Sequence, residues 1–174
     1  MSLLALDIGN TNLVLGIFEG DRLTHSFRLH TNRQQTGDEY GILLKSLLAE
    51  TGHTMADVEG VAVSNVVPEL SMRIEEVCRR YLKLEPLYVN SERNLGIRLE
   101  VDRPAEVGAD LLAGAVAARV RWGLPCIVVD LGTATTLSVL SPEGAYLGTV
   151  IAPGLEISVE AITRRAPHLP GIRM

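Results

Sequence analysis

The spacing of hydrophobic residues at the start of the chain predicts strands. Residues 3–9 and 12–18 are short apolar runs, and residues 22–29 carry apolar side chains spaced mostly by two. Such spacing is typical of a strand that buries one face. Turn-forming residues at 19–21 separate the second run from the third. We therefore expect three antiparallel strands.

Helical spacing follows these strands. Apolar residues recur every three or four positions between Tyr40 and Leu48, and Gly52 is placed to end the helix. The same reasoning predicts further helices over residues 68–81, 104–122 and 153–162, and strands over 60–67 and 87–89. Strands alternating with helices indicate an α/β fold.

A later segment repeats the start of the chain. Residues 127–136 match residues 4–13 at a constant offset of 123. Each copy is an apolar strand, an Asp, an apolar residue, a Gly and a Thr/Asn cluster, followed by two more strands and a helix. A period this long excludes a solenoid and indicates duplicated lobes. We expect residues 1–122 to form the first lobe and residues 123–174 the first half of the second.

Both copies end their first strand in an Asp-x-Gly loop, which we expect to hold one phosphate-bearing ligand between the lobes. Gly9 and Gly132 allow a tight turn and a close approach of the backbone. Asp7 and Asp130 would hold hard cations, or waters on them, during phosphoryl transfer. A single such sequence is more often an ordinary turn, but two copies in the same context favour a site. Side-chain donors to phosphate come from Asn10, Thr11, Thr133, Thr135 and Thr136.

A third acidic residue, Asp110, lies among the apolar and small residues of segment 107–114. Ala113 and Gly114, one helical turn further on, leave open space over its carboxylate. We expect Asp110 to act as the general base, or an orienting group, for an attacking hydroxyl. The alternative is that Asp110 caps or pairs locally near the helix start.

Composition narrows the class of protein. The 174 residues are 47% hydrophobic and 21% charged, with a net charge of −5, which is typical of a soluble globular chain. The negative charge argues against nucleic-acid binding. We expect no membrane span and no signal peptide, because the apolar runs are strand-sized. The chain is therefore expected to be cytoplasmic.

The two cysteines and four histidines show no metal-ligand spacing. We expect Cys78 and Cys126 to be reduced, buried thiols. Solvated or packing roles are expected for the histidines, which are His25, His30, His53 and His168.

Four ordered motifs, at residues 7–12, 108–110, 130–136 and 151–154, resemble type III pantothenate kinase. The similarity covers essentially the whole chain. It implies the duplicated ribonuclease-H-like fold of acetate and sugar kinases, heat-shock ATPases and actin, with the second lobe incomplete here. It also implies transfer of phosphate from ATP to pantothenate, the first step of coenzyme A synthesis. The enzyme would be a cytoplasmic homodimer that uses Mg²⁺ and a monovalent cation, K⁺ or NH₄⁺.

The resemblance also implies residue roles. Asp110 would be the proton acceptor, Asp130 would bind the monovalent cation, and Asp7 is a candidate Mg²⁺ ligand. Thr133 would bind ATP. The ATP phosphates would contact Asp7, Ile8, Gly9, Asn10, Thr11, Asn12, Leu13 and Val14. The pantothenate pocket would be lined by Gly108, Ala109, Asp110 and Leu111.

The chain departs from the family pattern at several positions, and the family chain is normally longer. Leu111 replaces an Arg that helps to hold the anionic substrate, a loss on the order of 2 kcal/mol. The other departures are Val101, Arg103, Ser138 and Thr149, where the family usually has an aromatic residue, Asn, Asp and Gly. They leave two alternatives open: a catalytically deficient homologue that binds a nucleotide or a protein, and a kinase with a neutral alcohol substrate.

Overall fold

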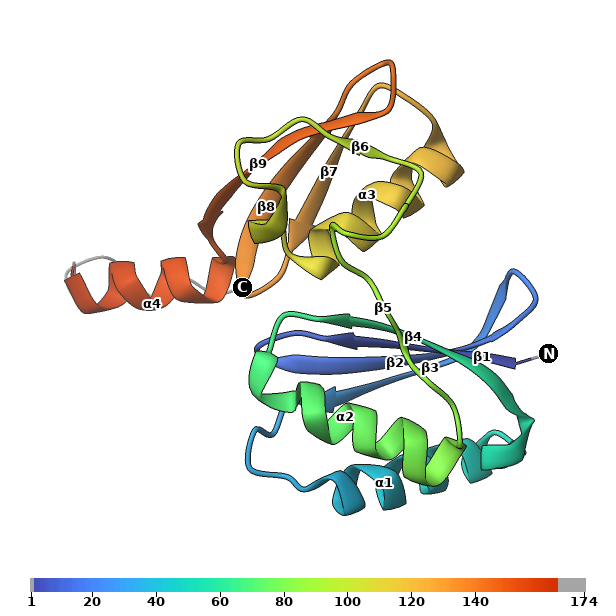
Figure 1. Cartoon of the computed structure of the whole chain (residues 1–174). Helices are drawn as coiled ribbons and strands as arrows, with labels where there is room; N and C mark the ends of the chain where they lie inside the picture. Colours follow the sequence, from blue (N-terminus) through green and yellow to red (C-terminus); the bar gives the residue numbers. More distant parts are fainter. Residues whose placement is uncertain (1, 166–174) are drawn as a thin grey trace. The chain divides into compact units, whose positions relative to one another are not determined.

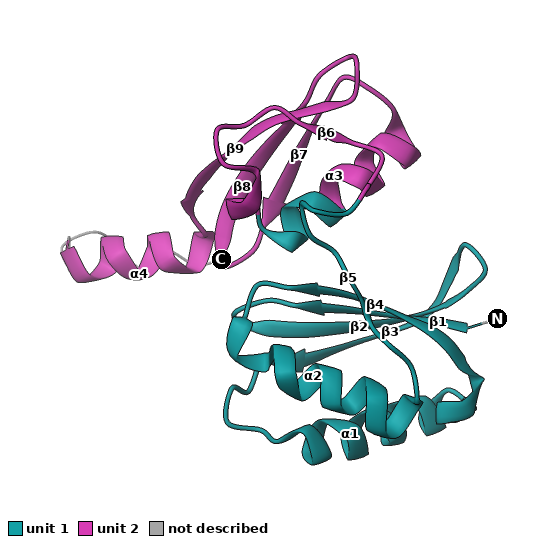
Figure 2. Cartoon of the chain, in the orientation of Figure 1, with its two compact units in different colours: residues 1–93, 108–113 teal, residues 94–107, 114–174 magenta. Residues whose placement is uncertain are grey.

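The computed structural model describes residues 2–165, which divide into two compact units (Figure 1, Figure 2). Unit 1 comprises residues 1–93 and 108–113, and unit 2 comprises residues 94–107 and 114–174. Residues 94–107 and most of helix α3 (Ala109–Trp122) belong to unit 2, and only the start of α3 belongs to unit 1. Each unit is described by itself below.

Unit 1 contains a five-stranded sheet in the order β3-β2-β1-β4-β5. The first three strands are antiparallel neighbours, as predicted, while β4 and β5 run parallel to β1. The strands are β1 (Ser2–Ile8), β2 (Asn12–Glu19), β3 (Arg22–His30), β4 (Val58–Asn65) and β5 (Leu87–Tyr88). The predicted helix at 68–81 is present as a 3₁₀ turn η2 (Pro68–Leu70), α2 (Ser71–Val77) and a π-helical turn η3 (Cys78–Leu82).

Helices α1 (Gly37–Glu50) and α2 cover the same face of this sheet (Figure 1). The covered face of β1 carries Leu4, Leu6 and Ile8, which are at most 6% exposed. Their burial against Leu44 and Ile74 stabilises the unit through the hydrophobic effect. The opposite face of β1 carries Asp7, since side chains alternate along a strand. A short 3₁₀ turn, η1 (Met55–Asp57), precedes β4.

Unit 2 contains a four-stranded sheet in the order β6-β9-β8-β7. The strands are β6 (Arg98–Leu99), β7 (Cys126–Leu131), β8 (Ala134–Leu140) and β9 (Ala145–Pro153), and α4 (Leu155–Arg165) follows them. The prediction of one helix over 104–122 is wrong at its start. A 3₁₀ turn, η4 (Pro104–Glu106), comes first, and α3 begins only at Ala109 because the backbone of Val107 is extended.

The repeat is visible in the strands, but helices pack on opposite faces of the two copies. Strands β7, β8 and β9 form the same antiparallel meander as β1, β2 and β3. In unit 2, α3 packs on the face of β7 that carries Val128. The other face of β7 is exposed by 55% to 67% at the residues that correspond to Leu4, Leu6 and Ile8, namely Ile127, Val129 and Leu131.

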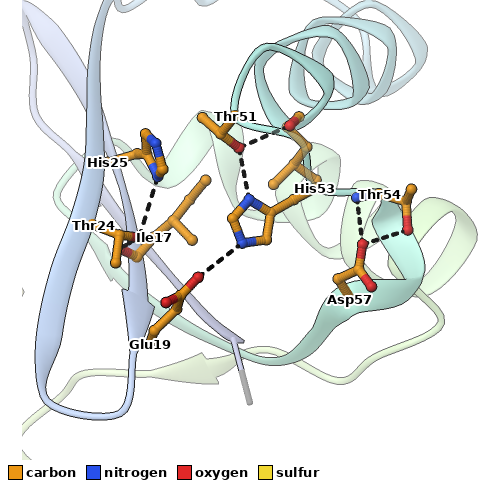
Figure 3. Close-up of polar contacts among 9 residues, drawn as sticks. Ile17, Glu19, Thr24, His25, Thr51, His53, Thr54 and Asp57 are labelled. Atoms are coloured by element: carbon orange, nitrogen blue, oxygen red, sulfur yellow. Dashed lines mark hydrogen bonds and ion pairs between the residues drawn. The ribbon is translucent and has the colours of Figure 1, made fainter.

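Two of the histidines of unit 1, His25 and His53, pack against one another near the tip of the β2–β3 hairpin, whereas His30 is exposed at the other end of β3 (Figure 3). The His53 side chain is 14% exposed, with Nε2 3.3 Å from Glu19 Oε1 and Nδ1 2.9 Å from Thr51 Oγ1. The His25 and His53 rings are in a T-shaped arrangement at a centroid distance of 5.9 Å. His168 lies outside the described residues. Within residues 2–165, no cluster of three His, Cys, Asp or Glu side chains could hold a metal, and no helix is long and apolar enough to cross a membrane.

The two cysteines are both unpaired, but their surroundings differ. Cys78 is fully buried in the core of unit 1, and burial raises the pKa of its thiol to about 11. Cys126 is only partly buried, contrary to expectation, because it lies on β7 at the edge of its sheet.

This difference predicts selective thiol chemistry. A chromogenic disulfide reagent at pH 8 should react quickly with Cys126 and only slowly with Cys78, because the thiolate is the reactive form and Cys78 stays protonated below its raised pKa. Cys126→Ser should remove the fast phase and Cys78→Ser should leave it unchanged. A fast phase that survives Cys126→Ser would contradict this assignment.

Candidate functional site

The first Asp-x-Gly loop connects the carboxyl end of β1 to β2 through Gly9, Asn10 and Thr11. The Gly9 N–H donates to the Asn12 carbonyl at 2.9 Å and closes the turn. A Cβ on residue 9 would lie 3.1 Å from that carbonyl oxygen, so the turn favours glycine. The side chains of Asn10 and Thr11 are exposed at the loop. The loop therefore presents polar groups to solvent on a closed turn.

Thr31, which directly follows β3, holds this loop in place. Its N–H donates to the Thr11 carbonyl at 2.9 Å, and its Oγ1 donates to the Gly9 carbonyl at 2.7 Å. The residue is only 7% exposed. Two hydrogen bonds from one buried residue fix the path of the loop without any ligand.

The segment after Thr31 is anchored at the start of α1. Tyr40 donates its hydroxyl hydrogen to the Asn32 carbonyl at 2.9 Å. Thr36 and Glu39 form a capping box, in which the Thr36 N–H donates to Glu39 Oε2 at 2.7 Å. The hydrogen bonds from Thr36 lower the pKa of the Glu39 carboxyl. Residues 31–36 are therefore fixed at both ends.

Gly108 lies at the same edge of the unit 1 sheet as the first loop. A Cβ on residue 108 would lie 3.7 Å from Val66 Cγ1. The Val66 N–H donates to the Ile8 carbonyl at 3.0 Å, which places Val66 directly beside the end of β1. The structure thus brings two separate predicted motifs, the Gly9–Thr11 loop and Gly108–Asp110, to one edge of one unit.

Asp110 is exposed in the first turn of α3. Its Oδ1 accepts the Leu111 N–H at 2.8 Å, so the predicted local pairing is present for this oxygen. A Cβ on residue 108 would come within 2.5 Å of the same oxygen, so glycine leaves room for the carboxylate. Its second oxygen makes no hydrogen bond within residues 2–165. A carboxylate with one anchored and one open oxygen suits a proton acceptor.

The second loop lies in unit 2 and is held differently. The Gly132 N–H donates to the Ala134 carbonyl at 3.0 Å, and the Gly154 N–H donates to the Thr133 carbonyl at 3.1 Å. Gly154 lies 123 positions after Thr31, so the same repeat position holds both loops. A Cβ on residue 154 would overlap the carbonyl oxygens of Gly132 and Thr133, so only glycine fits at this position. Asp130 is exposed on β7, opposite Thr136.

The second loop also has one residue fewer between the last paired residues of its two strands. Leu131 pairs with Thr135, whereas Ile8, at the corresponding position, pairs with Leu13. The offset of 123 therefore describes β1 and β7, but the two hairpins differ in register by one residue. Equal sequence positions in β2 and β8 do not have equal surroundings.

Comparison with known proteins decides the family. The family model described as type III pantothenate kinase matches residues 3–174. The chain belongs to the type III pantothenate kinase family. The type III pantothenate kinase of Thermomicrobium roseum is 46% identical over 167 residues, which cover 96% of this chain and 64% of the relative. The chain thus spans slightly less than two thirds of that kinase's length.

Solved structures show the fold. The ethanolamine utilization protein EutJ from Carboxydothermus hydrogenoformans matches with a TM-score of 0.56 at 16% identity, over 98% of this chain and 58% of its own. The activator of the 2-hydroxyisocaproyl-CoA dehydratase from Clostridium difficile, with bound ADPNP, matches with a TM-score of 0.54 at 14% identity. The match covers 98% of this chain and 53% of the activator chain. These likenesses confirm the predicted α/β fold.

Two of the departures from the type III pantothenate kinase pattern contact one another. Ser138 and Thr149 are paired on β8 and β9, and their hydroxyl oxygens are 2.6 Å apart. The Tyr146 hydroxyl also hydrogen-bonds to Thr149. The two changes therefore form one partly buried polar cluster. Of the remaining departures, Arg103 pairs with Glu106 at 3.0 Å, and Leu111 is half-buried.

Sequence reasoning missed two residues at the site of this type III pantothenate kinase family member. Thr31 carries no motif signal, because its role depends on where β3 ends. Ser64 pairs in register with Asp7, so both side chains are on the same face of the sheet. Its Oγ is buried and lacks a hydrogen-bond partner within residues 2–165. Its place beside Asp7 follows only from the parallel pairing of β1 and β4.

Thr31→Val tests how the first loop is held. The substitution keeps the shape of the side chain but leaves the partly buried Gly9 carbonyl without its side-chain donor, which should destabilise unit 1 by about 1–3 kcal/mol. Urea unfolding followed by circular dichroism measures this loss. Thr31→Ser keeps the hydroxyl and should lose about 1 kcal/mol or less. Equal losses in both variants would contradict the role of the hydroxyl.

Proposed function

We propose that this chain acts in ATP-dependent phosphorylation of pantothenate, the first step of coenzyme A biosynthesis. Family membership supports this function, since the relatives that match nearly the whole chain are named type III pantothenate kinases. The observation that carries the proposal is the meeting of the Gly9–Thr11 loop and Gly108–Asp110 at one edge of unit 1. Such an arrangement can hold a phosphate donor and a proton acceptor close together.

The first loop would bind the ATP phosphates. Asn10 and Thr11 are exposed there and carry side-chain donors, which fit phosphate oxygens. The Clostridium difficile activator that shares this fold has ADPNP bound, which supports a nucleotide as the ligand. We expect the full set of ATP contacts to run from Asp7 to Val14 and, as the family resemblance implies, to include Thr133.

Asp110 would accept the proton of the pantothenate hydroxyl. The hydroxyl oxygen attacks the γ-phosphorus, the bond from that phosphorus to the β–γ bridging oxygen breaks, ADP leaves, and the proton passes to the carboxylate. Gly108, Ala109 and Leu111 would line the pocket around the substrate. Most of the rate enhancement in such transfers comes from positioning and charge stabilisation.

We expect the enzyme to use two kinds of cation. The exposed carboxylates of Asp7 and Asp130 are hard oxygen ligands, which fit Mg²⁺ and a monovalent cation such as K⁺ or NH₄⁺ respectively. When bound, Mg²⁺ supplies charge neutralisation for the phosphates. We also propose a cytoplasmic homodimer, as the family resemblance implies.

A coupled assay of ADP release tests this function. The chain with Mg²⁺, K⁺ and ATP should release ADP only when pantothenate is added. Asp110→Asn should lower kcat by about 10²–10⁴ because the proton acceptor is lost. ATP affinity should remain, since residue 110 does not contact the phosphates in this scheme.

Asp21→Asn is the matched control, because Asp21 is exposed in the β2–β3 turn at the other end of the sheet. It should leave kcat unchanged. The absence of pantothenate-dependent ADP release from the unmodified chain would refute the proposed function. Full activity in Asp110→Asn would refute only the role of that carboxylate.

A further inference from the structure

Arg33 contacts the first loop through its side chain. Its Nη2 donates to Asn10 Oδ1 at 2.7 Å, and both residues are exposed. Arg33 belongs to none of the motifs that the sequence presents. Its side chain nevertheless places a permanent positive charge on the loop that carries the predicted phosphate ligands.

The backbone around Arg33 is held in position. Thr31 is fixed to the loop by two hydrogen bonds, and the guanidinium of Arg73, on α2, donates to the Arg33 carbonyl. The Gln35 N–H donates to the Asn32 carbonyl at 3.3 Å, so the chain turns here. Less backbone entropy is lost on ligand binding when the segment is already held in place.

Arg33 also determines how the Asn10 amide is oriented. A guanidinium only donates hydrogen bonds, so the Asn10 atom that faces it must be the oxygen. This contact resolves the usual ambiguity between the amide oxygen and nitrogen. Asn10 Nδ2 therefore points away from Arg33, and it makes no hydrogen bond within residues 2–165. Its two hydrogens are available to an acceptor.

We propose that Arg33 is a phosphate-binding residue of this chain. It directs Asn10 Nδ2 to a phosphate oxygen of a nucleoside triphosphate and offers its own remaining N–H groups to the same phosphate chain. The positive charge offsets the repulsion that the exposed Asp7 carboxylate exerts on phosphates at this edge. The inference rests on the proposed function, because it takes the Gly9–Thr11 loop as the phosphate site.

Binding of ATP and of inorganic tripolyphosphate, measured by calorimetry on the full chain, tests this role. Arg33→Ala should raise the Kd for both ligands roughly 10- to 100-fold, the range for a lost charge-assisted hydrogen bond. The Kd values of Arg33→Lys should lie between those of the unmodified chain and those of Arg33→Ala, because an ammonium group keeps the charge but lacks the planar donor geometry of a guanidinium. The loss of affinity caused by Arg33→Ala should be smaller at high salt, since Arg33 is exposed and its charge is screened.

Arg22→Ala is the control. Arg22 is exposed at the opposite end of β3, about 27 Å along the strand from residue 30, and its loss should leave both Kd values unchanged. In the double variant with Asn10→Ala, the two losses should be less than multiplicative, because Arg33 acts partly through Asn10. Multiplicative losses would refute the orienting role.

The outcomes separate the inference from the proposed function. Unchanged affinity in Arg33→Ala would overturn the inference and leave the function standing. Affinity lost in Arg33→Ala, together with no pantothenate-dependent turnover of the unmodified chain, would support the inference and overturn the function. An unmodified chain that binds neither ATP nor tripolyphosphate would overturn the inference and the nucleotide-binding part of the proposal.

Discussion

The two hydrogen bonds from Thr31 to the Gly9–Thr11 loop tie the start of the sheet to the end of its third strand. They exist because the β2–β3 hairpin returns the chain to the carboxyl end of β1, where it lies beside the turn. The loop is thereby shaped before a ligand arrives. Preorganised donors are worth more to binding than donors that must first be ordered. The placement of Arg33 and Asn10 depends on this same anchoring.

In unit 2 a different residue holds the corresponding loop. Gly154 holds the second loop through its backbone N–H alone, and its lack of a side chain is what lets the backbone come so close. Thr31 uses a buried hydroxyl in addition. The residue that holds the loop therefore stands at the same repeat position in both units, but it is Thr in one and Gly in the other. The two hairpins also differ in register by one residue.

Much of the fold follows from local pattern. The three N-terminal strands, α1 and the internal repeat are visible as periodicity, and Asp110 stands out as an acidic residue among small apolar ones. The break before Ala109 could not be predicted, because it depends on the extended backbone of Val107. The contacts of Thr31, Ser64 and Arg33 were equally hidden, since strand register decides which distant residues meet. Register also explains why the departures Ser138 and Thr149 form one hydrogen-bonded pair.

The most direct test of the site is to observe which backbone amides respond to Mg-ATP. Two-dimensional ¹H–¹⁵N NMR of the labelled chain should show the largest shifts at residues 10–12 and 31–33, where we place the phosphates and their anchoring segment. The β2–β3 turn at residues 19–22, at the far end of the same strands, should not respond. Shifts concentrated at that turn, with residues 10–12 unaffected, would contradict the assignment of this loop as the phosphate site.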